Sequence, residues 1–282
     1  MQPDMTESNI LQSLCNQVQK TGNLADAFPW LVEHNVPRFI LSQLWPELLK
    51  TLPQFQIHEN QQPLLSFAAS EPNWKGRIEN IKSKLVADTP DDEASQLAFI
   101  FNKSYIMQAD QVLFLARFRS DFALLLLPFR SLQSPTVQLK QRDEPSTIFK
   151  TNTGTIHHYS ATGTLHFESP LLPSIQPIKA TAYSRVGIQV IGRELSGLAL
   201  LAVAKARHHE YRSIESNKGL FEDAYASILK VRSTARLRRP DIELSKQIID
   251  TFAQSEIATH GLWQHFATNL NFLSKANRKS AE

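Results

Sequence analysis

The apolar side chains of the first 120 residues recur at the spacing of helices. Three stripes have apolar positions three or four residues apart: residues 10–18, 39–48 and 94–107. Ser8 stands where an N-cap is expected before the first stripe, and the acidic residues 91–93 suit the N-terminus of the third. Five prolines from Pro29 to Pro63 interrupt this region. We therefore predict several short helices rather than one long helix.

The pattern changes to that of strands between residues 121 and 192. Residues 122–129 are a short continuous apolar run, as in a buried strand, and residues 137–140 and 153–168 alternate between apolar and polar positions. Residues 180–191 are rich in β-branched and aromatic side chains, which favour strands. Because the links between these segments look short, we expect four to six strands in a mostly antiparallel sheet.

Helical spacing returns from residue 193 to the end of the chain. Residues 195–206 are apolar nearly all round, which predicts a deeply buried helix, and three further helices are expected after it. These three cover residues 220–235, 242–253 and 262–273. The sequence thus predicts an α+β fold with a helical region (1–120), a β-rich region (121–192) and a second helical region (193–282). We expect one compact unit, with the first region as a candidate separable lobe.

Composition narrows the class of protein and its compartment. The chain has 282 residues, of which 42% are hydrophobic and 20% charged, so collagen-like, coiled-coil and disordered classes are excluded. A single cysteine excludes a disulfide framework within the chain and a cysteine-based zinc module. The first eight residues carry two acids and no base, unlike a secretory signal. Since the longest apolar run falls well short of the roughly 20 residues that span a bilayer, we expect a cytoplasmic protein without a membrane anchor.

Charge is unevenly distributed along the chain. Residues 1–140 have a net charge of −2 and residues 142–282 a net charge of +5. The strongest basic segment, residues 230–239, has five bases and no acid. We call the following set the basic ridge: Lys205, Arg207, Arg212, Lys230, Arg232, Arg236, Arg238 and Arg239. Guanidinium groups on such a ridge suit phosphate oxygens, and phosphate contacts release counterions without requiring base recognition.

The basic ridge leads to two hypotheses about function. The first is a non-enzymatic nucleic-acid-binding regulator, or an accessory subunit of a nucleoprotein assembly, that contacts the phosphates of DNA or RNA. The alternative is an adaptor or scaffold protein whose ridge binds an acidic protein partner. A solvated face whose bases complement the C-terminal ends of helices would have the same composition. We expect no cofactor, because the chain has only nine glycines and no phosphate-binding loop motif.

A third hypothesis is a metal-dependent enzyme. If residues 161–163 formed a hairpin turn, His166 would lie opposite His157 or His158, and Glu168 would share the face of His166. Two imidazoles and one carboxylate on one face of a sheet can bind a transition metal and leave positions open for water or substrate. The alternative is a partly exposed sheet face with polar side chains and no metal.

Overall fold

The computed structural model describes residues 7–24, 27–53, 64–72, 78–87, 96–143, 148–151, 154–168, 173–234 and 237–258. Helices and turns before and within the sheet region are α1 (Glu7–Thr21), α2 (Ala27–Glu33), the π-helical turn η1 (His34–Arg38), α3 (Phe39–Leu44), α4 (Pro46–Thr51), η2 (Ile78–Asn80) and η3 (Phe129–Gln133). Those after the sheet are α5 (Ala180–His208), η5 (Glu215–Asn217), α6 (Lys218–Thr234) and α7 (Arg239–Ala253). The predicted helix 262–273 lies outside the described residues.

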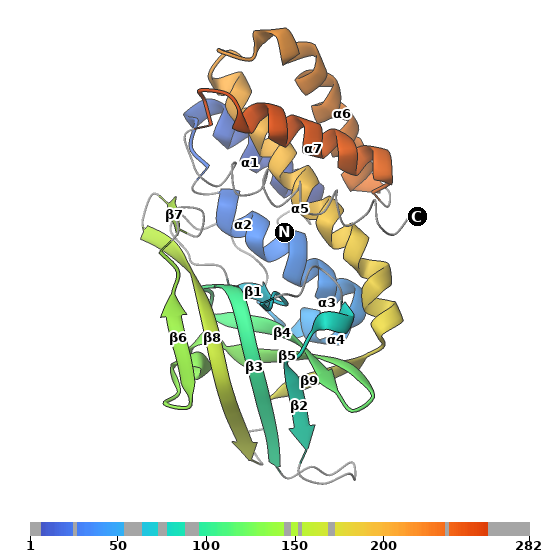
Figure 1. Cartoon of the computed structure of the whole chain (residues 1–282). Helices are drawn as coiled ribbons and strands as arrows, with labels where there is room; N and C mark the ends of the chain where they lie inside the picture. Colours follow the sequence, from blue (N-terminus) through green and yellow to red (C-terminus); the bar gives the residue numbers. More distant parts are fainter. Residues whose placement is uncertain are drawn as a thin grey trace.

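The strands of the described residues form one sheet below the helices (Figure 1). They are β1 (Leu65–Ala68), β2 (Lys84–Ala87), β3 (Gln96–Met107), β4 (Gln111–Phe118), β5 (Asp121–Pro128), β6 (Val137–Gln141), β7 (Ile148–Thr151), β8 (Gly154–Glu168) and β9 (Ser174–Ile178). The order is β6-β8-β3-β2-β4-β5-β9, with β1 beside β4 and β7 beside β8. All pairs are antiparallel except β1 with β4 and β2 with β4. The α+β class with a mostly antiparallel central sheet is confirmed.

The boundaries of the sheet differ from the prediction. The sheet runs from Leu65 to Ile178, so the predicted helix at 94–107 is instead the strand β3. Leu97, Phe99 and Phe101 all point into the core at alternate positions, although the apolar residues around them also fit helical spacing. The predicted strand at 180–191 is the first half of α5, whose β-branched residues pack on the sheet at helical intervals.

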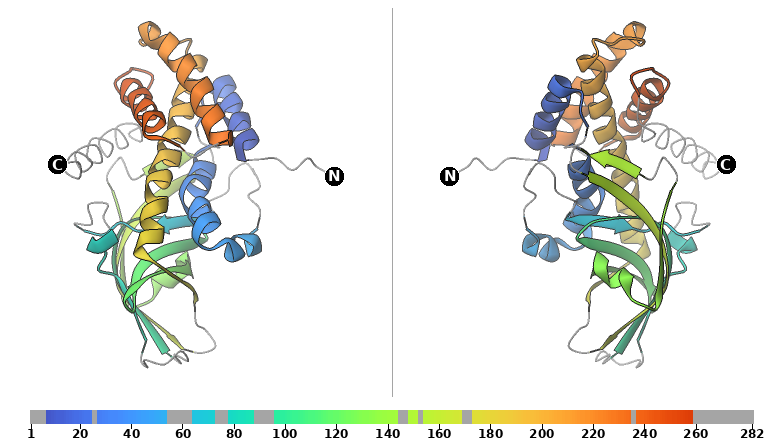
Figure 2. Two further views of the ribbon diagram at one scale, coloured as in Figure 1. Left: turned by 90° about the vertical axis from the view of Figure 1, so that its right-hand side faces the viewer. Right: turned by 90° about the vertical axis from the view of Figure 1, so that its left-hand side faces the viewer.

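Helix α5 links the two parts of the molecule. It runs from the sheet into the helical bundle (Figure 2). Its first half contributes Tyr183, Val186 and Val190 to a cluster between the sheet and the helices that cover it. Its second half is buried among α1, α2, α6 and α7, which confirms the predicted buried helix over residues 195–206. A third cluster, which includes Phe99 and Phe114, fills the other face of the sheet.

Helix α5 also meets the length and hydropathy criteria for a membrane-spanning helix, within the described part of the chain. However, 62% of its most apolar window is buried inside the fold. Because the core helix of a globular protein passes the same test, this feature is weak evidence for a membrane span.

Two buried carboxylates hold the ends of β1. Glu33, at the end of α2, accepts hydrogen bonds from the backbone N–H of Leu64 (2.8 Å) and from Arg38. Glu71, after β1, accepts a hydrogen bond of 2.7 Å from the backbone N–H of Lys82 and pairs with Lys103 of β3. Burial raises the pKa of Glu33 despite its partner Arg38. Burial acts in the same direction on Glu71, but Lys103 and the hydrogen bonds outweigh it and lower the pKa of Glu71.

Two glycines of α5 predict opposite effects of the same substitution. A Cβ on Gly197 would lie 2.5 Å from Asn35 Nδ2 and 2.7 Å from a methyl of Leu31, whereas nothing lies within 4 Å of a Cβ on Gly187. We expect Gly197→Ala to destabilise the protein by about 1–3 kcal/mol through overpacking. Gly187→Ala should stabilise it by up to about 1 kcal/mol through helix propensity. Urea unfolding of both variants measures the difference, and equal effects would contradict this close packing.

Candidate functional site

An exposed tyrosine in an unusual backbone conformation lies at one end of β3. The register of β3 against β8 shifts between Lys103 and Ile106, where β3 has one more residue than its partner. Tyr105 lies in this β-bulge with φ 58°, and 41% of it is exposed. The left-handed conformation costs a residue with a side chain roughly 1–2 kcal/mol. Bulges and strained residues of this kind are common beside functional sites.

Arg142 and His158 surround the ring of Tyr105. The guanidinium carbon of Arg142 lies 4.1 Å from the centroid of that ring, and Arg142 Nη2 donates to the hydroxyl oxygen over 3.3 Å. The ring of His158 approaches edge-on, with its centroid 6.5 Å away. Arg142 is further fixed through its backbone N–H, which donates to the carbonyl of His158 over 2.9 Å. We call Tyr105, Arg142 and His158 the Tyr105 cluster.

Tyr105 lies near the end of β3, two residues before Met107. This end of β3 points toward the helices (Figure 1). A partly exposed aromatic ring beside a cation attracts planar ring systems by stacking, and the cation favours those that carry negative charge. The burial pattern of β3 records the bulge, because its buried positions change from odd to even numbers between Lys103 and Ile106, which is the mark of an inserted residue. No sequence motif marks the cluster.

The residues proposed as metal ligands do not come together. β8 runs from Gly154 to Glu168 without a turn at 161–163, so His166 and Glu168 lie far along the strand from His157 and His158. His158 is opposite Met107, whereas His166 is opposite Ala98 near the other end of β3. In the described residues no group of three or more His, Cys, Asp or Glu side chains could hold a metal ion. The expected hairpin, and with it this constellation, is therefore wrong.

The first half of the basic ridge does not form a free positive surface. Lys205 is buried. Arg207 donates from Nε and Nη2 to the carboxylate of Glu222 over 2.9 and 2.5 Å, and its guanidinium lies 4.0 Å from the ring centroid of Tyr225. Arg212 is exposed in the α5–α6 loop. The charge of Arg207 is thus paired with that of Glu222 at a half-buried position between α5 and α6.

The second half of the ridge divides between interior and surface. Arg232 donates to the carbonyl of Arg193 and the hydroxyl of Ser196, both over 2.6 Å, and to Asn35 Oδ1 over 2.9 Å. This guanidinium therefore links α5, α6 and η1. The remaining members of the basic ridge differ in exposure. Lys230 and Arg239 are exposed, Arg238 is exposed and lies 3.3 Å from Asp241, and Arg236 lies outside the described residues.

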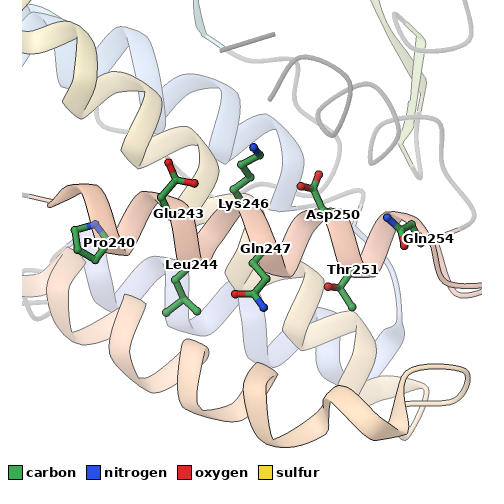
Figure 3. Close-up of a pocket in the computed structure, with 8 residues that line it drawn as sticks. All are labelled: Pro240, Glu243, Leu244, Lys246, Gln247, Asp250, Thr251 and Gln254. Atoms are coloured by element: carbon green, nitrogen blue, oxygen red, sulfur yellow. The ribbon is translucent and has the colours of Figure 1, made fainter. Parts of the chain in front are cut away.

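A pocket on the outer face of α7 is a second candidate. Its volume is about 590 Å³ and its side chains lie along a single helix (Figure 3). The lining residues are Pro240, Glu243, Leu244, Lys246, Gln247, Asp250, Thr251 and Gln254. The pocket is open to solvent and carries acids, a base and amides in no convergent arrangement. The Tyr105 cluster is therefore the better candidate site.

Comparison of the sequence with family models and with curated proteins finds no match. Solved structures share the fold. Glutaryl-CoA dehydrogenase from Mycobacterium smegmatis has a TM-score of 0.60, with 10% identity over 92% of this chain and 73% of its own. A structure of that kind of enzyme from the same organism in complex with FADH2 has a TM-score of 0.55, with 11% identity over 94% of this chain and 75% of its own. A flavoprotein nitroalkane oxidase has a TM-score of 0.58, with 14% identity over 89% of this chain and 68% of its own. At these identities the likeness establishes the fold alone.

These neighbours overturn the leading functional hypothesis. The structures named above are dehydrogenases and an oxidase, and a butyryl-CoA dehydrogenase from Megasphaera elsdenii also shares the fold. The interpretation as a non-enzymatic nucleic-acid-binding regulator or accessory subunit, and the DNA-binding role that went with it, is therefore wrong. Its physical basis was weak as well, because the half-buried Arg207 and Arg232 are engaged by neighbouring side chains of the protein.

Arg232 is predicted to contribute to stability. Arg232→Met removes three hydrogen bonds, including the one to the buried side chain of Asn35, so we expect a loss of about 2–3 kcal/mol. Arg239→Met, at the exposed start of α7, should change stability by less than about 0.5 kcal/mol. Denaturant melts of the two variants test this, and similar stabilities would contradict an internal role for Arg232.

Tyr105 is predicted to store strain. Glycine adopts the left-handed conformation freely, so Tyr105→Gly should be about as stable as the wild type or more stable, despite the lost ring contacts. Ile100 is equally exposed, at 40%, on the same strand but outside the bulge. There glycine should cost about 1 kcal/mol. If thermal unfolding showed Tyr105→Gly to be the less stable variant, the strain would not exist.

Proposed function

We propose that this protein is a flavin-dependent oxidoreductase that binds flavin adenine dinucleotide. The observation that carries the proposal is the likeness of fold to flavoenzymes over about nine tenths of the chain, one of them crystallised with FADH2. From the sequence we expected no cofactor, and the proposal of a bound flavin replaces that expectation. The cytoplasmic location and a protein partner, both expected from the sequence, stay predictions.

The Tyr105 cluster fits the chemistry of a flavin. The isoalloxazine system is planar and can stack on an aromatic ring, and Tyr105 presents such a ring at the end of the sheet. A reduced flavin carries negative charge on its pyrimidine ring, which the neighbouring guanidinium of Arg142 would stabilise. The cluster therefore supplies both a stacking surface and a cation, from different segments of the chain.

The chain's own residues would bind and orient the cofactor. When bound, a flavin accepts two electrons and a proton from the substrate. Tyr105 would hold the ring plane, and Arg142, whose guanidinium lies on the Tyr105 ring, would supply a positive charge beside it. Ile106, the next residue along β3, is completely buried in the cluster that fills this face of the sheet, and it would exclude water from the inner side of the site.

Flavin binding can be measured directly. Titration of flavin-free protein with flavin adenine dinucleotide should quench the flavin fluorescence with saturation. Tyr105→Ala should weaken binding by about tenfold or more, because a stacking contact contributes roughly 1–3 kcal/mol. Ile100→Ala removes a side chain of equal exposure from the same strand and should bind as the wild type does. Absence of binding to the wild-type protein would refute the proposal.

The oxidoreductase part requires a second measurement. Under anaerobic conditions, the loaded protein should lose its visible flavin absorption on addition of a reducing substrate. The probes are butyryl-CoA, glutaryl-CoA and 1-nitrohexane, taken from the proteins and complexes that share the fold. Bleaching by one probe identifies the substrate class. A flavin that binds but is reduced by none of them would restrict the proposal to flavin binding.

A further inference from the structure

A fully buried lysine lies two residues before Tyr105. The ammonium of Lys103 is completely shielded from solvent. It donates to Glu71 Oε1 (2.7 Å), to the carbonyl of Leu115 (2.7 Å) and to the carbonyl of Ala69 (3.3 Å). Burial lowers the pKa of Lys103 to about 8, while Glu71 opposes the shift. All three donor positions of the ammonium therefore have acceptors, and each acceptor lies outside β3.

Stability alone does not explain a charged pair at this position. Taking two charges out of water is expensive, and replacing a buried ion pair by apolar side chains of similar volume is often neutral or stabilising. The neighbouring inward-facing positions of β3, Phe99 and Phe101, show that apolar side chains suit this face. The charged Lys103 at the next inward position therefore indicates that the ion pair serves to hold the backbone in a particular conformation.

The backbone hydrogen bonds around Lys103 show where the pairing of β3 with β8 is interrupted. Up to Lys103, β3 is paired with β8, and Lys103 lies opposite Ala161. The backbone N–H of the next residue, Ser104, donates instead to the carbonyl of Ser70 over 2.8 Å, in the segment that carries Glu71. Pairing with β8 resumes only at Ile106. Lys103 and Ser104 are thus drawn toward the segment after β1, and Tyr105 is the residue left between the two pairings.

We propose that the Glu71–Lys103 ion pair is a positioning device that forms the bulge and thereby presents Tyr105 for ligand binding. Lys103 and Glu71 touch no ligand in this scheme, so they act through Tyr105. The inference deepens the proposed function, on which its flavin readout rests, and names residues outside the Tyr105 cluster that the site requires. It also explains why the strained residue follows so closely on a buried cation.

The test separates positioning from folding. Lys103→Met alone leaves Glu71 buried without its cation and should lower the melting temperature markedly. The double variant Glu71→Gln/Lys103→Met removes both charges and should recover most of the wild-type melting temperature. Flavin affinity of the double variant should nevertheless remain about tenfold or more below the wild type, because the bulge is no longer held. Glu71→Gln/Lys103→Leu is the substitute if the first double variant does not fold.

A readout that does not need flavin accompanies this experiment. Tyr105 is exposed, whereas Tyr159 is half-buried and the other three tyrosines are buried. Nitration followed by peptide mapping therefore reports on Tyr105 separately from the rest. In the double variant Tyr105 should be nitrated several-fold faster than in the wild type, since the contact with Arg142 would be lost. Arg232→Met, destabilised far from β3, is the matched control and should leave the rate of nitration of Tyr105 unchanged.

The outcomes distinguish the two proposals. A double variant with wild-type melting temperature, flavin affinity and nitration rate would overturn the positioning role. If the wild type binds no flavin, the proposed function fails, and the nitration rates still decide whether the ion pair positions Tyr105. Weak flavin binding together with fast nitration in the double variant supports both.

Discussion

The arrangement of helices and sheet depends on two buried carboxylates that fix a four-residue strand. Glu33 ends α2 and holds the backbone N–H of Leu64 before β1, while Glu71 follows β1 and holds the start of β2 and the interior of β3. Because β1 lies parallel to β4, the connection between them must cross from one end of the sheet to the other, and both ends of β1 have to be held in place. A carboxylate can accept several backbone and side-chain donors at once, which no apolar contact can do.

The sequence predicted the class of the fold but placed the sheet too late in the chain. Leu97, Phe101 and Tyr105 fit a helical stripe because intervals of four are shared by helices and strands. The alternation that decides for a strand includes the buried side chains of Phe99 and Lys103, and the inward position of a lysine is not evident in a sequence because lysines are mostly exposed. The first half of α5 was mistaken for a strand because its β-branched residues have β propensity, which tertiary packing overrides.

The candidate site was beyond reach of sequence reasoning for a related reason. Arg142 and Arg207 look alike in a sequence, yet one lies on an exposed aromatic ring and the other is held by a carboxylate of the next helix. Guanidinium groups that bind phosphate and those that join helices have the same chemistry, and only the positions of Glu222 and Tyr105 in space separate them. The metal site predicted at the histidines of β8 is wrong for a similar reason. The prediction assumed a turn where the strand continues through Gly163.

The packing of α1 against α5 and α7 affects the order in which the chain can fold during synthesis. The apolar face of α1, with Leu11 and Leu14, is buried in the same cluster as Leu198 of α5 and Ile249 of α7. A ribosome delivers α1 well before either partner, since the whole sheet is synthesised in between. An apolar face that emerges before the sheet is thus covered only after the sheet has been made. During synthesis the nascent chain must keep that face from other apolar surfaces until its C-terminal helices arrive.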